Sequence, residues 1–586
     1  MKRSTLLLFA KCSAVFLWLS LLIKTDSYYS IYLLVGIISV VTIFKNQNIK
    51  SNHVRLDYIF AGFFSLAVTL ANYSLFSQIA EPGGTYIIAA IVFFILTFIS
   101  GIIVFQNILS ATKRISVQAT KKFTDSPRKI FLTTFLIFFI IDLAILFICC
   151  YPGTLTSDSI DEIGQILSGT YSNHHPFYYT ILIYPFIQIG TNLFHDINIG
   201  IAMFNIFQIT IISLAFSYSI STLYRIGISK KILYPLAIFL AILPYNIVYS
   251  FTIWKDVLFG AFFLIFTVSL YRYFQNFCSD KKSKIINLLI ISFSGLAICL
   301  FRSNALLAIF VSVLVFFIIF KRRYLKLGII LIIIVIAAFV LKRPVLQSAN
   351  VTQPDTIESL SIPSQQITRV LKYNLNQISE QDIELINNVA NVNDLAEAYS
   401  PDIQDPIKNI IRKGNQSYIK EHLADFISLY IRLGIQHPVQ YAKAWIDQTR
   451  GYWNGGYDYW IWRNSIQSND YDIERRSDSL LSNIFNRYLE FYPKIPFLQP
   501  LVSIGLVVWL LFILLYRTII DKNKNNLFLL VPIFAIWATL LIATPVFSEF
   551  RYVYFMFTTT PFLALAIFAK TPKQSLLVKR KKYEKR

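Results

Sequence analysis

The sequence predicts an all-α polytopic membrane protein with about 14 transmembrane helices, one partial or re-entrant helix and a helical extracytoplasmic domain. Of the 586 residues, 55% are hydrophobic and only 15% are charged, whereas soluble domains carry about 25% charged residues. Mean hydropathy is +0.56, and apolar runs long enough to cross a bilayer recur along the chain. This composition excludes an ordinary soluble enzyme, a disordered chain and a disulfide-rich secreted module.

The apolar runs locate the expected spans in chain order. The first is too long for a signal peptide and no small-residue cleavage site follows it, so we expect it to be retained. The expected spanning helices cover residues 5–23, 29–45, 57–77, 85–108, 129–150, 198–222, 231–250, 254–273, 285–301, 303–320, 325–341, 498–518, 526–544 and 551–569. One further apolar run covers residues 175–193.

The distribution of charge predicts which helix ends face the cytoplasm. The chain carries a net charge of +22, but residues 342–497 hold 16 basic and 18 acidic side chains, so the positive excess lies in short loops and in the tail. Cytoplasmic loops of membrane proteins are enriched in Lys and Arg. We therefore expect a multi-pass protein of the cell membrane with both termini in the cytoplasm, residues 342–497 outside the cell, and no nucleic-acid partner.

The same charges indicate that one apolar run does not cross the membrane. The segment from Tyr151 is expected outside and Arg225 inside, which allows one crossing, yet two apolar runs lie between them. The first of these, 175–193, contains Pro185 and Gln188. We expect it to be the partial or re-entrant helix.

These assignments divide the chain into five parts. The N-terminal transmembrane helices cover residues 1–150, a core with an acidic first outer loop covers 151–341, the mainly helical extracytoplasmic domain covers 342–497, the C-terminal transmembrane helices cover 498–570, and a basic cytoplasmic tail covers 571–586. The aromatic segment 451–462 is expected either at the membrane interface or as a stacking surface for a sugar or lipid head group.

The candidate catalytic residues lie in the loop after the fifth expected span. Asp158, Asp161 and Glu162 are spaced i, i+3 and i+4, so a helix would place three carboxylates on one face. Crowded carboxylates raise a pKa or attract a divalent cation, and a carboxylate can take a proton from a hydroxyl nucleophile. The alternative is a local role, because Asp158 can cap the helix and Ser159 with Glu162 fits a capping box.

The candidate substrate-binding residues lie at helix ends that are expected on the same outer face. His174 and His175 open the partial helix, and their imidazoles could donate to a phosphate. Four charged residues at the ends of later helices are further candidates: Lys255, Asp256, Arg302 and Arg551. Charges at such positions are costly unless they are paired or solvated, and several cations on one face could hold a phosphate or pyrophosphate. The alternative is that each cation anchors its own helix end at the membrane surface.

Gln365, Gln366 and Arg369 complete the candidates, in the extracytoplasmic domain. Their side chains could contact a sugar or phosphate, or dock the domain on the membrane helices. No nucleotide-binding glycine loop and no nucleophile elbow occurs, and the five cysteines show no C-x-x-C spacing. No motif requires a cofactor or forms a metal site, and only the acidic loop offers a place for a divalent cation.

The motifs resemble the first outer loop of the GT-C superfamily of membrane glycosyltransferases. The resemblance rests mainly on residues 151–270, with the acidic loop PGTLTSDSIDEI, then SNHHPFYYT, then the helix start Trp254-Lys255-Asp256. It is nearest in style to protein O-mannosyltransferases and lipid A aminoarabinose transferases. The longer pattern, which adds Arg302-Ser303-Asn304, SQQITRV and HPVQYAKAWIDQTRGYW, resembles an uncharacterised family of bacterial multi-pass membrane proteins.

The resemblance implies a GT-C-like fold and transfer of a sugar from a polyprenyl-phosphate donor to a glycan, protein or lipid acceptor of the cell envelope. It implies that Asp158 is the general base and that Asp161 or Glu162 positions the acceptor or a metal. It also implies that Lys255, Arg302 and Arg551 hold the leaving phosphate. Two other functions stay open. One is a cell-surface glycan polymerase or ligase, and the other is a transporter or flippase of lipid-linked glycans. A transporter would be expected to contain pseudo-repeated halves.

Overall fold

The computed structural model describes residues 54–79, 84–114, 117–118, 125–277, 280–455, 461–476, 479–495 and 498–570. Regular structure in these residues is helical except for one two-residue pairing of strands, β1 (Val117–Gln118) with β2 (Ala569–Lys570). The predicted all-α class is confirmed. The expected spans 5–23 and 29–45 and the basic tail 571–586 lie outside the described residues.

Within the described ranges, 10 helices are long and apolar enough to cross a membrane, or up to 11 if one bent pair counts as a span. The 10 are α3 (Val54–Ala71), α5 (Gly84–Arg114), α6 with its π-helical end η1 (Pro127–Cys150), α9 (Ile197–Ile226), α12 (Lys255–Phe274), α13 (Lys281–Phe301), α14 (Ser303–Phe320), α15 continued through α16 (Leu325–Ser348), α26 (Lys524–Ala543) and α27 (Phe550–Phe568). The bent pair is α10 (Lys230–Ile242) and α11 (Pro244–Ser250), at 64°. A shorter apolar helix is α25 (Ile504–Ile520). The chain is therefore a multi-pass membrane protein.

The run expected to be partial forms α8 (Phe177–Leu193), which is not one of the 10 candidate spans. It packs closely along α9 through two glycines. A Cβ atom at Gly190 would lie 2.5 Å from the backbone nitrogen of Gly200, and one at Gly200 would lie 2.6 Å from the carbonyl oxygen of Phe186. Small residues let two apolar helices approach this closely in a membrane protein.

The bundle is built around α12, because 16 of its 20 residues are buried. It packs against α9, α13 and α27. Helices farther out expose large apolar side chains, for example Phe293 of α13 at 65% and Ile318 of α14 at 75%, as expected of surfaces that face lipid. The end of the bundle at which α6 ends and α12 and α27 begin is called the site end below.

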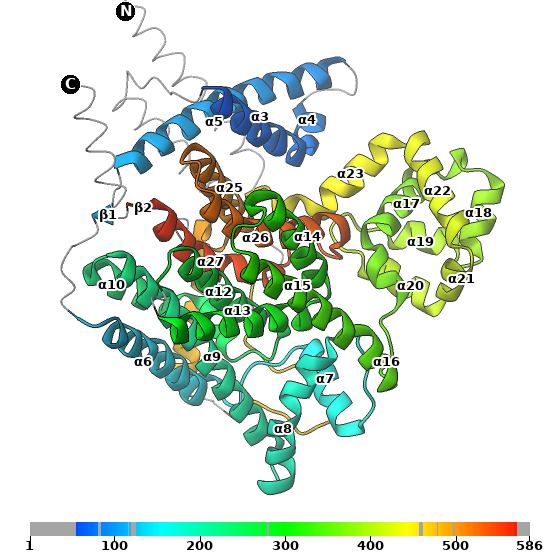
Figure 1. Ribbon diagram of the computed structural model, residues 1–586. Helices are drawn as coiled ribbons and strands as arrows, with labels where there is room; N and C mark the ends of the chain where they lie inside the picture. The colour runs from blue at the N-terminus through cyan, green and yellow to red at the C-terminus, as the bar shows by residue number, and fades with distance from the viewer. Residues whose placement is uncertain are drawn as a thin grey trace, which may run out of the picture.

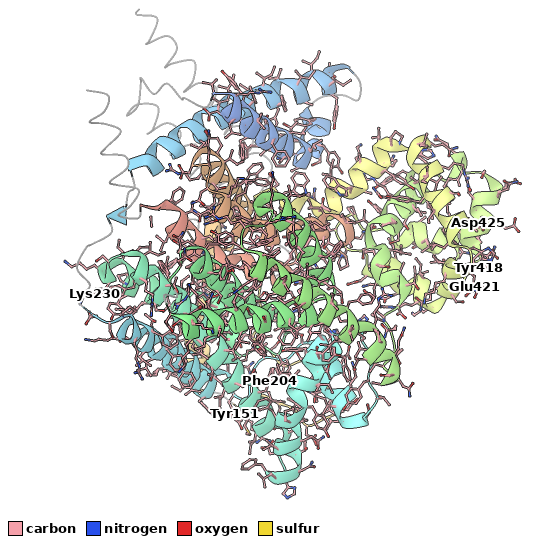
Figure 2. The ribbon with its side chains drawn as sticks, in the orientation of Figure 1. Tyr151, Phe204, Lys230, Tyr418, Glu421 and Asp425 are labelled. Carbon is pink, nitrogen blue, oxygen red and sulfur yellow. The ribbon has the colours of Figure 1, made fainter. Side chains whose placement is uncertain are left out.

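A group of short helices stands apart from the bundle, at the right of Figure 1. These helices are η3 (Thr356–Leu360), α17 (Ser361–Asn374), α18 (Glu380–Asn387), α19 (Val392–Ala398), α20 (Asp405–Lys413), α21 (Gln416–Glu421), α22 (Leu423–Gln436) and α23 (Pro438–Thr449). They surround a separate hydrophobic core that runs from Ile357 to Tyr441, whereas residues from Ile446 onward join the core of the bundle. We call residues 355–449 the outer domain. In Figure 2 its residues Tyr418, Glu421 and Asp425 lie at the opposite side from Lys230, where α10 begins.

Shorter elements connect these parts. They are α4 (Tyr73–Ile79), α7 (Ser157–Ser168), α24 (Leu480–Phe491) and the turns η4 (Leu375–Gln377), η5 (Arg450–Tyr452), η6 (Tyr492–Lys494) and η7 (Gln499–Val502). The outer domain is joined to the bundle by backbone hydrogen bonds to the loop before α27. Gln404 donates to the carbonyl of Pro545 (2.9 Å), and Phe547 donates to the carbonyl of Asp402 (3.0 Å).

The aromatic segment 451–462 was expected at an interface or as a stacking surface, and this expectation is wrong for Tyr452 and Trp453. Both side chains are buried in the core of the bundle. Their carbonyl oxygens accept hydrogen bonds from the indole nitrogens of Trp537 and Trp509, each at 2.8 Å. The Tyr452 hydroxyl accepts from the backbone of Glu549 (3.0 Å) and donates to the carbonyl of Val546 (3.0 Å). Tyr452 therefore holds the loop that leads into α27, and residues 456–460 of the segment lie outside the described part of the chain.

Replacing Gly451 by alanine is expected to destabilise the protein by about 1–3 kcal/mol, the usual effect of forcing an extra carbon into a packed core. The new Cβ would lie 2.4 Å from the Cβ of Ser548 and 2.5 Å from the carbonyl oxygen of Phe547. Chemical unfolding of the purified protein measures the effect. Gly62→Ala is the matched control, because its Cβ would make an ordinary 3.6 Å contact with Phe98. Equal stability of the two variants would contradict the prediction.

Candidate functional site

Helix α7 carries the three acidic residues. It begins at Ser157, one residue before Asp158, which was a candidate N-cap. Its N-cap is Thr156, and the backbone N–H of Thr156 donates to the hydroxyl of Ser159 (3.1 Å). The expected capping roles of Asp158 and of the Ser159–Glu162 pair are therefore wrong. Asp158 lies in the first turn with its carboxylate free to contact other helices.

The start of α7 is tied to the chain just before α12. The backbone of Thr154 donates to the carbonyl of Phe251 (2.9 Å), and the Ser159 hydroxyl donates to the carbonyl of Ile253 (2.8 Å). The indole nitrogen of Trp254 donates to the hydroxyl of Thr156 (2.7 Å). Because α12 begins at the next residue, Lys255, these bonds bring the first turns of α7 and α12 together.

Asp158 lies at the centre of the resulting cluster. Its Oδ2 atom is 2.6 Å from Nη1 of Arg551, 3.9 Å from Nζ of Lys255 and 3.9 Å from Nδ1 of His175. Burial favours the neutral acid, but the positive charges of Arg551 and Lys255 outweigh it and hold the pKa of Asp158 well below its usual range. Asp158 is therefore ionised at any physiological pH.

His175 lies between Lys255 and Asp161. Its Nδ1 is 3.0 Å from Nζ of Lys255 and its Nε2 is 3.7 Å from Oδ2 of Asp161. Burial, together with the charge of Lys255, lowers the pKa of His175, so the imidazole is neutral at pH 7. Because an ammonium group can only donate, Nδ1 accepts and the single ring proton resides on Nε2, facing Asp161.

A second ion pair joins Arg302 to Asp256, the second residue of α12. Nη1 of Arg302 is 2.7 Å from Oδ1 of Asp256, and the same nitrogen donates to the carbonyl of Tyr552 (3.1 Å). The Asp256 side chain is fully buried and that of Arg302 is 10% exposed. Nζ of Lys342 donates to the carbonyls of Cys299 (2.9 Å) and Arg302 (3.1 Å). Lys342 thus orients the backbone at Arg302, a role for which the sequence offers no signal beyond a lysine after an apolar run.

Arg551 is held from three sides. Besides the bond to Asp158, its Nε lies 3.3 Å from Oε1 of Glu549, and its guanidinium stacks on Trp254, 5.3 Å from the ring centroid. An arginine fixed by an aromatic face and two acidic side chains keeps a defined orientation and presents its remaining N–H groups in one plane. Of the candidates at helix ends, the cluster therefore contains Asp158, Asp161, Glu162, His175, Lys255, Asp256, Arg302 and Arg551.

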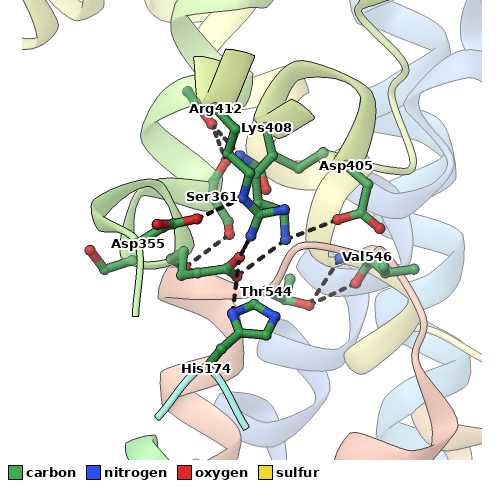
Figure 3. A network of polar contacts seen from close by, with 12 residues as sticks. His174, Asp355, Ser361, Asp405, Lys408, Arg412, Thr544 and Val546 are labelled. Carbon is green, nitrogen blue, oxygen red and sulfur yellow. Dashed lines mark hydrogen bonds and ion pairs between the residues drawn. The ribbon is translucent and has the colours of Figure 1, made fainter. Parts of the chain in front are cut away.

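His174 lies apart from the cluster, although it is adjacent to His175. Its Nδ1 is 3.9 Å from Oε1 of Glu358, a carboxylate that also binds Lys408 (3.2 Å) and Arg412. Figure 3 shows His174 facing this network, which belongs to the outer domain. His174 therefore contributes to the contact between the loop that joins α7 to α8 and the outer domain.

Gln365, Gln366 and Arg369 do not lie with the cluster either. All three are buried in α17 and bond within the outer domain, to Ser400, Gln448, Tyr441, Tyr430, Gln440, Tyr399 and Asp447. Arg369 forms an ion pair with Asp447 at 2.7 Å, and Asp447 also accepts from the hydroxyl of Tyr73 in α4 (2.8 Å). Gln365 and Gln366 therefore stabilise the outer domain itself, and Arg369 is linked through Asp447 to α4.

The described residues contain no group of three or more His, Cys, Asp or Glu side chains arranged to hold a metal ion. Asp158 and Asp161 instead point to Arg551 and His175. What the cluster offers chemically is an ionised carboxylate, a neutral imidazole and three cations within a partly buried space at the end of the bundle.

Protein stability is expected to fall as the pH rises from about 5 to about 8, because two buried acids hold protons in the folded state. Burial raises the pKa of Glu549 to about 7 and the pKa of Glu162 well above its usual range. A raised folded-state pKa contributes stability that is complete below the unfolded pKa, about 4.3, and is lost as the pH passes the folded pKa. Thermal unfolding at several pH values measures this slope. Glu549→Gln should reduce it and Glu490→Gln, at an exposed position of α24, should not; equal slopes in all three proteins would contradict the prediction.

The fold and the site define a class of protein: a multi-pass helical membrane protein with a buried acid–base cluster at one end of its bundle. The chain belongs to the family of unknown function DUF6020, whose model matches residues 167–581. No curated protein and no solved structure matches the chain. The matched region begins after the acidic part of α7 and includes the cations of the cluster. The resemblance to an uncharacterised multi-pass family is thereby confirmed.

Proposed function

We propose that the protein is an integral membrane glycosyltransferase of the GT-C type, which moves a sugar from a polyprenyl-phosphate donor to a cell-envelope acceptor at the outer face of the membrane. The observation that carries this proposal is the position of Asp158, an ionised carboxylate 2.6 Å from Arg551 and 3.9 Å from Lys255. A base next to two cations suits a reaction in which a hydroxyl loses a proton while a phosphate leaves.

The donor phosphate would bind at Lys255. The side chain of Lys255 is 18% exposed, and its ammonium group carries three N–H donors, of which His175 takes one at 3.0 Å. Arg551 lies on the other side of Asp158 and offers further N–H groups. Because the cluster lies where α12 and α27 begin, a donor bound there would keep its polyprenyl chain in the bilayer.

The transfer step balances without a further reactant. The acceptor O–H gives its proton to the carboxylate of Asp158, and the acceptor oxygen forms a bond to C1 of the sugar. The bond between C1 and the phosphate oxygen breaks, and its electron pair leaves with the polyprenyl phosphate. Lys255 and Arg551 stabilise the charge that develops on this phosphate.

Donor binding would also activate the base. In the free protein the cations hold the pKa of Asp158 low, so the carboxylate is a weak base. A bound phosphate would share Arg551 and Lys255 with Asp158, which reduces their effect on the carboxylate. Asp158 would therefore gain basicity when the donor is in place.

We also propose a complete topology. Spans at 5–23 and 29–45, together with α10–α11 and α25, bring the total to about 14 spanning helices, with α8 as the partial helix. The positive-inside pattern places the termini in the cytoplasm and the outer domain outside the cell. The cluster would then face the compartment in which lipid-linked sugars are used.

Transfer by the full-length protein tests the proposed function. The protein in lipid nanodiscs would be given a panel of labelled polyprenyl-phosphate sugars with cell-envelope acceptors, and label in the acceptor would be counted. Transfer of one or more sugars is the expected result. If none is transferred but labelled lipid-linked glycan crosses the bilayer of proteoliposomes, the protein is a transporter and the proposal is overturned.

A further inference from the structure

Helix α24 (Leu480–Phe491) presents three different faces. One face is buried against the bundle and consists of Ser482, Phe485 and Leu489. A second is exposed and polar, with Asn483, Asn486, Arg487 and Glu490. The third is exposed and apolar, with Leu480 at 76%, Leu481 at 52%, Ile484 at 54% and Phe491 at 59%. Because successive helical residues turn by about 100°, these sets occupy separate sectors of the helix.

Two hydrogen bonds show where α24 lies relative to the spans. The Ser482 hydroxyl donates to the carbonyl of Ile148 (3.4 Å), and the Tyr488 hydroxyl donates to the carbonyl of Ile242 (2.6 Å). Ile148 is in η1, the π-helical end of α6, and Ile242 ends α10 just before the bend to α11. Helix α24 therefore lies across η1 and the end of α10.

We propose that α24 is an interfacial helix whose exposed apolar face is inserted in the lipid leaflet at the site end. The side chains of Ile148 and Ile242 are themselves each 47% exposed, so the apolar face of α24 continues a surface that faces lipid. Lipid surrounds these parts of α6 and α10, so the apolar face of α24 contacts lipid rather than another protein. An amphipathic helix at this level lowers its free energy by turning its apolar face to the acyl chains and its polar face to water.

The residues next to the apolar face fit this position. Tyr488 flanks it and is partly exposed, and aromatic side chains with a polar end favour the membrane–water interface. Lys494 follows the helix, with its ammonium 5.5 Å from the ring centroid of Phe491. A lysine of this kind can lie along apolar surface while its charge reaches the head groups.

The lipid contact also bears on the site. The segment 461–476, which precedes α24, pairs with the loop that leads into α7. Gln467 donates to the carbonyl of Leu155 (2.9 Å), Leu155 to that of Ser465 (3.3 Å), and Arg476 to that of Tyr151 (3.1 Å). Insertion of α24 would therefore hold the start of α7 at a set height relative to the bilayer. This inference does not depend on the proposed transfer reaction.

Photo-crosslinking in nanodiscs tests the proposal. Benzoylphenylalanine would replace Ile484 on the apolar face, or Arg487 on the polar face, in the full-length protein with radiolabelled phospholipid. We expect a lipid adduct when the probe is at position 484 and no lipid adduct when it is at position 487. Both positions are exposed, so both variants should fold, and Ile318 of α14 is a positive control for lipid contact because it is 75% exposed.

Three outcomes would overturn the proposal. The first is no adduct at position 484 while position 318 reacts, which would place the apolar face in water. The second is equal labelling at positions 484 and 487, which would mean that lipid does not distinguish the two faces. The third is an adduct between two copies of the chain at position 484, which would make the face a protein interface.

Discussion

Replacing Asp158 by asparagine is expected to lower the rate of sugar transfer by about 10²–10⁴-fold, the contribution of a positioned general base. An amide still accepts a hydrogen bond from Arg551, which lies 2.6 Å from the Asp158 carboxylate, but it cannot take the proton of the acceptor hydroxyl. The variant should therefore fold and bind donor while transfer fails. The initial rate of label transfer in nanodiscs, measured with the best donor of the panel, gives the result.

Asp125→Asn is the matched control for this variant. Asp125 also forms ion pairs, with Lys230 at 2.6 Å and Lys129 at 3.1 Å, but at the opposite end of the bundle. Transfer by this control should equal that of the wild type. If wild type and Asp158→Asn transfer sugar at the same rate, the protein is a glycosyltransferase but Asp158 is not its general base. If Asp158→Asn and Asp125→Asn lose activity to the same extent, the effect is not specific to the site.

Replacing Asp256 by alanine is expected to destabilise the protein by about 3–5 kcal/mol. The Asp256 side chain is fully buried and its partner Arg302, 2.7 Å away, is 10% exposed. Removing the carboxylate leaves a buried guanidinium without its counter-charge, and the cost of desolvating that charge is no longer offset. Unfolding in mixed SDS micelles measures the free-energy change.

Two further variants test whether the loss of stability comes from the unpaired buried charge. The double variant Asp256→Ala with Arg302→Ala should recover part of the lost stability, because neither buried charge remains. Asp521→Ala, which breaks the more exposed pair of Arg517 and Asp521 at the end of α25, should cost no more than about 1 kcal/mol. A loss for Asp256→Ala no greater than that for Asp521→Ala would contradict the prediction.

The membrane class and the approximate positions of the helices could be predicted from the sequence, because both follow from local composition. The expected helix 57–77 shows the limit of this approach. It divides into α3 and α4 at Asn72, whose side chain bonds back to the carbonyl of Val68 (2.8 Å). Likewise the apolar run 231–250 is continuous in hydropathy, yet it bends by 64° just before Pro244, which lacks the N–H needed to continue the helix.

The sequence indicated which residues belong to the candidate site better than it indicated which of them are in contact. Charge distribution and helix parity placed Asp158, Lys255, Arg302 and Arg551 at one face, and the structure brings them together. The sequence could not indicate that Asp158 contacts Arg551, 393 positions away, since spacing along a chain does not reveal which helix ends are neighbours. The polar residues of α17 resembled ligand-binding groups because burial inside a separate core has no local signature.

The sequence alone thus determined that this chain is helical, lies in a membrane and carries its ionisable groups at helix ends, because hydropathy and charge act over one turn or one span. Only the tertiary structure decided which charges pair, which histidine joins the cluster and where α24 lies. Those outcomes depend on the packing of helices that are distant in the chain. Packing is decided by the shape and burial of whole faces rather than by any local run of residues.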